Sequence, residues 1–177
     1  MREKKQIKAA ALLFLACSVA PAIWANRVAA VPSAASHAPG GELKIVAADV
    51  QLLLIAPNGR ETGYDPKIGK EKKTIPESSY YKDALLAFDS GRADTSTTQT
   101  IDVQHPAAGK YRLVVSSGGL AEGESYEVRV TLYRADGSEA SNARIAGTVK
   151  HDKAAMYELR LSAEPATVAI VHRVPGN

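Results

Sequence analysis

The feature that most constrains the fold of this chain is an alternation of apolar and polar residues with a period of two. In the segment ESYEVRVTLYR (residues 124–134), Tyr126, Val128, Val130 and Leu132 fall on one face and mostly charged residues on the other. A strand with this pattern turns one face to a core and the other to water. The same period recurs in four shorter segments, at residues 101–104, 111–115, 145–149 and 157–161. The chain is therefore predicted to be all-β.

Turn signals separate these segments. Asn58-Gly59 and Asp136-Gly137 supply the positive φ angles that tight turns need. About eight short strands punctuated in this way predict a single antiparallel β-sandwich, of either the immunoglobulin-like or the jelly-roll type. Residues 50–55 and 167–171 are apolar on both faces. We expect these two segments to be inner strands, or strands covered by a loop.

Residues 1–25 have the pattern of a secretory signal peptide. A basic stretch precedes an apolar run, and small residues follow as far as Ala25, the expected cleavage site. Residues 26–41, rich in Ala, Ser, Pro and Gly, are predicted to be a flexible linker, and the β-sandwich domain is expected to span 42–177. The protein is thus expected to be exported, to the periplasm or the extracellular medium.

Cys17 is the one cysteine of the sequence and leaves two outcomes open. The run Phe14-Leu15-Ala16-Cys17 is similar to the lipobox of bacterial lipoproteins, in which the cysteine is lipidated. Cleavage at Ala25 would instead leave a chain with no cysteine, and hence with no internal disulfide and no thiol nucleophile. Membrane association is expected only if Cys17 is lipidated or the signal is retained.

The charge balance argues against a nucleic-acid partner. The whole sequence has 22 Lys+Arg and 19 Asp+Glu, a formal net charge of +3. Residues 1–25 hold four of the basic residues and one of the acidic residues, so 18 of each remain from Asn26 onward. Nucleic acids and anionic membrane surfaces both attract a basic excess, which the mature chain lacks.

The segment 58–96 is predicted to be a long polar connection with at most one short element. Within it, residues 82–88 fit either a helical turn or an extra edge strand. Connections longer than about 15 residues are uncommon in compact domains and often bind something. Tyr64, Tyr80 and Tyr81 are therefore the candidate partner-binding residues, and packing of the same rings against the sandwich is the alternative.

The sequence gives little support for a catalytic or metal-binding motif. Asp89-Ser90-Gly91 occurs once, whereas aspartic proteases need two such aspartates. The four histidines are dispersed, without the spacing of a metal pair. A calcium site in the segment 58–96 stays open although no spacing supports it; its candidate ligands are Asp65, Asp83, Asp89 and Asp94. We predict no catalytic residue, no metal ligand and no cofactor, and expect that the chain is not an enzyme.

The run Pro106-Ala107-Ala108-Gly109-Lys110-Tyr111 favours a structural role. Gly109 suits a left-handed turn conformation, which leaves Tyr111 free to cap the connecting backbone with its hydroxyl group, as in a tyrosine corner.

Three motifs carry a resemblance to a known group of proteins. DVQLLLIAPNGRETGYDP (49–66) and IPESSYY (75–81) resemble segments that recur in exported bacterial proteins, and PAAGKYRLVV (106–115) is similar to a run in pre-peptidase C-terminal-like domains. The resemblance covers residues 43–172. It implies a β-sandwich accessory domain without catalytic activity. We expect a binding or structural module that contacts protein or glycan in the cell envelope or secretome; the alternative is a subunit or accessory domain of a secreted hydrolase.

Overall fold

The structure of the chain is a computed structural model that describes residues 41–86, 95–150, 153–162 and 166–174. The described residues form eleven β-strands and no helix. Accordingly, none of them belongs to a helix able to cross a membrane. The strands are β1 (Glu42–Ala48), β2 (Gln51–Ile55), β3 (Glu61–Asp65), β4 (Lys70–Lys73), β5 (Ser78–Leu86), β6 (Thr95–Gln104), β7 (Gly109–Ser116), β8 (Ser125–Tyr133), β9 (Glu139–Thr148), β10 (Ala155–Ser162) and β11 (Thr167–Val174).

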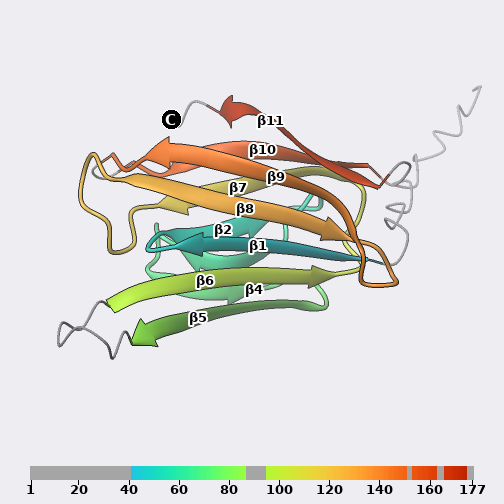
Figure 1. Ribbon diagram of the computed structural model, residues 1–177, viewed down its shortest axis with the longest axis horizontal. Helices are drawn as coiled ribbons and strands as arrows, with labels where there is room; N and C mark the ends of the chain where they lie inside the picture. The colour runs from blue at the N-terminus through green and yellow to red at the C-terminus, as the bar shows by residue number, and fades with distance from the viewer. Residues whose placement is uncertain (1–40, 87–94, 151–152, 163–165, 175–177) are drawn as a thin grey trace, which may run out of the picture. The chain divides into compact units, whose positions relative to one another are not determined.

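The strands form two antiparallel sheets, as Figure 1 shows. The five-stranded sheet has the order β5-β6-β1-β8-β9, and the six-stranded sheet has the order β11-β10-β7-β2-β3-β4. Every strand pairing is antiparallel. The all-β class and the two-sheet, sandwich-like arrangement predicted from the alternation are confirmed.

One hydrophobic core joins the inner faces of the two sheets. The predicted alternation is observed in β8, where Tyr126, Val128, Val130 and Leu132 are all buried. Two hydroxyl pairs also link the sheets. The Tyr126 and Tyr157 hydroxyl groups lie 2.8 Å apart, and those of Thr62 and Ser78 lie 2.7 Å apart. Buried hydroxyl groups need such partners, because an unpaired one costs about 1–3 kcal/mol.

The predicted turns and the predicted tyrosine corner are present. Gly59 and Gly137 adopt φ angles of 80° and 79° in the turns that join β2 to β3 and β8 to β9. Gly109 has a φ of 140°, and the Tyr111 hydroxyl donates to the carbonyl oxygen of Ala107 at 3.0 Å. Tyr111 is almost fully buried, and this burial raises its pKa to about 12.

The prediction of a long connection over residues 58–96 is wrong. This segment contains β3, β4 and β5, which brings the number of strands to eleven instead of about eight. β4 could not be recognised in the sequence, because Lys70–Lys73 is exposed along most of its length and has no apolar face. Of the two alternatives for residues 82–88, a helical turn or an extra edge strand, the structure shows the edge strand as far as Leu86. These residues belong to β5, which lies at one edge of the five-stranded sheet.

Of the two placements expected for residues 167–171, an inner strand is wrong, and cover by a loop stays a prediction. β11 is an edge strand of the six-stranded sheet, whereas β2, the other strand with two apolar faces, is an inner strand between β7 and β3 as predicted. β11 also contacts β9 and β8 of the five-stranded sheet. Val168 is buried by this packing, whereas Ala169 on the opposite face is exposed.

Candidate functional site

The most distinctive polar surface lies on the outer face of the five-stranded sheet. Alternation along β1 places Leu43 and Ile45 in the core, so Glu42 and Lys44 point outward. The strand register puts Asp102 of β6 directly opposite Lys44, and Tyr133 of β8 directly opposite Glu42. We call the outward group that surrounds Lys44 the Lys44 cluster; it consists of Glu42, Lys44, Tyr81, Asp102 and Tyr133.

Asp102 is the most constrained member of the Lys44 cluster. Its Oδ2 accepts a hydrogen bond from the Tyr81 hydroxyl at 2.7 Å. Its Oδ1 lies 3.7 Å from the Lys44 Nζ, which is within ion-pair range. That oxygen is buried and has no hydrogen-bond partner among the described residues. A buried acceptor without a donor is unusual, so Asp102 keeps an unused capacity to accept a hydrogen bond.

Opposing effects of burial and neighbouring groups set the pKa of Lys44. Desolvation is the largest single effect and acts to lower the pKa of Lys44, but the charge of Asp102 and the smaller effects of its neighbours together outweigh it, so the net result is a pKa above the ordinary value. Three other groups raise the pKa in the same direction: Tyr81, Glu42 and Tyr133. The hydrogen bond to Asp102 likewise raises the pKa of Tyr81. The cluster therefore holds Lys44 charged and Tyr81 neutral at physiological pH.

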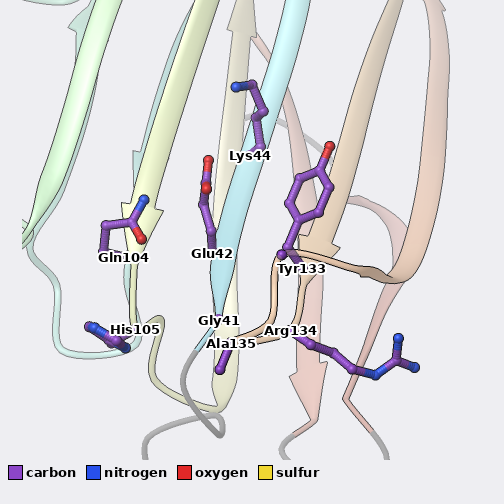
Figure 2. Close-up of a pocket in the computed structure, with 9 residues that line it drawn as sticks. Gly41, Glu42, Lys44, Gln104, His105, Tyr133, Arg134 and Ala135 are labelled. Carbon is purple, nitrogen blue, oxygen red and sulfur yellow. The ribbon is translucent and has the colours of Figure 1, made fainter.

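A pocket of about 340 Å³ opens at one end of the cluster. Figure 2 shows Glu42, Lys44 and Tyr133 pointing along the sheet, while Arg134 and His105 point away from them. His105 has a φ of 50°, a left-handed conformation that is uncommon outside glycine. The residues that line the pocket are Gly41, Glu42, Lys44, Gln104, His105, Tyr133, Arg134, Ala135 and Gly137.

The lining of the pocket holds several titratable groups. Glu42 is its single carboxylate and His105 its single imidazole, and Lys44 and Tyr133 lie in the same lining.

The three candidate tyrosines have different environments. Tyr80 points inward, packs against the core and donates a hydrogen bond to the Gln99 Oε1 at 2.5 Å. Tyr64 of β3 is half-buried and close enough to affect the pKa of Tyr80, which is raised to about 12 by burial first, then by Glu71 and Tyr64. Tyr81 points outward and is 38% exposed. The structure thus groups Tyr64 with Tyr80 and puts Tyr81 on the opposite face.

The sequence did not reveal the rest of the Lys44 cluster. Lys44, Asp102 and Tyr133 belong to three strands that are remote in sequence, and only the register brings them together. The predicted alternation over residues 101–104 and 124–134 placed Asp102 and Tyr133 on outward faces, but no strand was predicted over residues 42–48, so Lys44 was missed. Which strands are neighbours was not visible in the sequence, because that depends on the sheet order.

The acidic residues considered for calcium do not form a cluster in the described part of the chain. Asp65 forms an ion pair with Lys72 at 2.8 Å and accepts a hydrogen bond from the Lys67 backbone N–H. The hydrogen bond from Lys72 is the main cause of the lowered pKa of Asp65. Asp83 lies on the exposed strand β5. No group of three potential metal ligands occurs among the residues that the structure describes.

Several predicted features lie outside the described residues. They are the signal peptide with Cys17 and Ala25, the linker as far as residue 40, and the run Asp89-Ser90-Gly91 with Asp94.

Comparison with known proteins adds no relative. No protein-family model matches the chain, and no curated protein or solved structure is significantly similar to it.

Proposed function

We propose that this protein is a non-catalytic binding module of the cell envelope or secretome, exported by the signal peptide at residues 1–25. Partner contact, to protein or glycan, takes place on the outer face of the five-stranded sheet. The observation that carries this proposal is the Lys44 cluster, in which a charged pair lies between two outward-facing tyrosines, Tyr81 and Tyr133.

The chemistry of this surface suits recognition. A tyrosine offers a rigid apolar ring with a polar tip, which is why tyrosine is enriched at interfaces. Tyr81 is held in place by Asp102, so little conformational entropy is lost when a partner covers the ring. Asp102 and Lys44 supply an acceptor and a donor beside it.

The tyrosine corner supports a finer assignment of the fold. A tyrosine hydroxyl that bonds the backbone a few residues upstream is a hallmark of immunoglobulin-like sandwiches. Tyr111 makes this bond to Ala107. We therefore favour the immunoglobulin-like type over the jelly-roll type, in line with the resemblance to pre-peptidase C-terminal-like domains.

The test is co-purification of the full-length protein from its native envelope, combined with mass spectrometry of the mature N-terminus. The mature N-terminus distinguishes cleavage at Ala25 from lipidation at Cys17. A Tyr81→Ala variant is expected to lose the partner. The matched control is Ile68→Ala, because Ile68 is 56% exposed but lies in the turn between β3 and β4 of the other sheet.

The outcomes separate the alternatives. Equal capture by both variants would contradict the assignment of the Lys44 cluster as the contact surface. Recovery of a secreted hydrolase whose activity depends on the protein would favour the role of hydrolase accessory domain.

A further inference from the structure

β5 is an edge strand whose outer backbone groups face no other strand among the described residues. It spans nine residues and ends the five-stranded sheet, where it pairs with β6 alone among the described strands. The side chains from Tyr81 to Ala84 are exposed. Such an edge is a template for another strand, and proteins usually block it with charges, bulges or a covering segment.

The hydrogen bonds at the ends of β6 show which backbone groups of β5 remain open. His105 donates its backbone N–H to the Gly41 carbonyl, and Asp49 donates its backbone N–H to the Thr97 carbonyl. The backbone N–H and C=O groups of the odd-numbered residues of β6 therefore point toward β1. Gln104 donates to the Glu77 carbonyl, so the even-numbered residues bond toward β5.

The register then assigns the two sides of β5. Tyr81 lies opposite Thr100, and Asp83 lies opposite Thr98, so these two residues of β5 bond to β6. In an antiparallel pair the intervening residues direct their N–H and C=O groups away from the neighbour. The backbone groups of Tyr80, Lys82 and Ala84 therefore face outward.

β4, at one edge of the six-stranded sheet, is protected in a way that β5 is not. It has four residues, three of them lysines, and short lysine-rich edges resist pairing. β5 is longer and carries one lysine and one aspartate, adjacent to each other. A strand with one charge of each sign can pair with a second copy of itself in a register that separates like charges.

We propose that two copies of this protein associate by antiparallel pairing of β5 with β5, about a two-fold axis at Tyr81. Registers centred on the four exposed residues, Tyr81 to Ala84, differ in the pairs that they form. Centring on Ala84 pairs only residues 82–86 of each copy, whereas an axis at Tyr81 pairs residues 78–84. Centring on Lys82 or on Asp83 puts that charged residue directly opposite itself, and like charges opposite each other are destabilising.

Centring on Tyr81 avoids this repulsion. It places Lys82 of one copy opposite Tyr80 of the second copy, where an ammonium group can contact an aromatic ring. The backbone N–H and C=O groups of Lys82 and Tyr80 both point away from β6. Each Lys82–Tyr80 pair between the two copies can therefore exchange two backbone hydrogen bonds.

The pairing would join the two five-stranded sheets into one. Both Lys44 clusters would then lie on a single continuous face, next to the seam formed by the two Tyr81 side chains. Two sites on one assembly raise the apparent affinity for a repetitive partner without any new contact at either site. The dimer itself does not depend on what that partner is.

Single-cysteine variants test the pairing and its register. The full-length chain carrying Cys17→Ser is combined in turn with Tyr81→Cys, Lys82→Cys or Asp83→Cys and then oxidised. In the proposed register the two Tyr81 positions form a non-hydrogen-bonded pair with Cα atoms about 4.5 Å apart. This separation suits a disulfide, so Tyr81→Cys is expected to give a covalent dimer and the other two variants are not.

Sedimentation of the chain without added cysteines gives an independent measurement. We expect a concentration-dependent dimer that Lys82→Pro abolishes, because proline removes an outward N–H without breaking a bond to β6. The matched control Lys82→Ala keeps that N–H and is expected to remain dimeric. A monomer at every concentration, or cross-linking at position 82 or 83 as readily as at position 81, would overturn the proposal.

Discussion

The two faces of the five-stranded sheet use the same residue types for opposite purposes. Tyr80 and Tyr81 are adjacent in β5, yet Tyr80 packs against the core while Tyr81 is exposed beside Asp102. Both hydroxyl groups donate to a side-chain oxygen of β6. On the inner face the acceptor Gln99 is 2% exposed, whereas the acceptor Asp102 on the outer face belongs to the Lys44 cluster.

This comparison shows that burial decides what a polar contact contributes. A hydrogen bond that satisfies a buried group prevents a large penalty, whereas a contact at the surface competes with water and adds little. The inner face should therefore control stability, and the outer face should control binding.

The largest expected difference between the faces is at the neighbouring residues Ile45 and Lys44. Ile45 is fully buried, so Ile45→Ala should lower the free energy of unfolding by about 2–5 kcal/mol. Lys44 forms a partly exposed ion pair, so Lys44→Ala should lower it by at most about 1 kcal/mol. Urea unfolding measures both values. A loss for Lys44→Ala as large as that for Ile45→Ala would mean that the Lys44 cluster is structural.

The inner face was largely predictable from the sequence, and the outer face was not. A period of two in β8 identified its core residues, and Gly109 with Tyr111 identified the tyrosine corner, because both signals are local. The assembly of Lys44 with Asp102 depends on β1 lying beside β6, and these two residues are 58 positions apart in sequence. β4 was missed because it is exposed along most of its length and has no buried face to produce an alternation. β5 was predicted only in part, as one alternative for residues 82–88, because its side chains from Tyr81 to Ala84 are all exposed.

A smaller difference is expected when only the hydroxyl group of each tyrosine is removed. Tyr80→Phe leaves the buried Gln99 Oε1 without its donor and should cost about 1–3 kcal/mol. Tyr81→Phe removes a bond at an exposed position and should cost at most about 1 kcal/mol. Thermal and urea unfolding of the two variants give the comparison. Equal losses would show that Asp102 depends on Tyr81 as much as Gln99 depends on Tyr80.

The last expected effect is a pH dependence of the Tyr80→Phe difference. Burial favours the neutral phenol and raises the pKa of Tyr80 from 10.0 to about 12 in the folded protein. Its contribution to stability is therefore complete below pH 10 and is lost as the pH rises toward 12, because the unfolded chain ionises first. The Phe variant lacks this loss, so the stability gap between the two proteins should narrow over that range. Tyr111 also has a pKa of about 12, but it is present in both proteins and cancels in the comparison. A gap that stays constant from pH 8 to pH 12, measured by urea unfolding, would show that Tyr80 is not shielded from water.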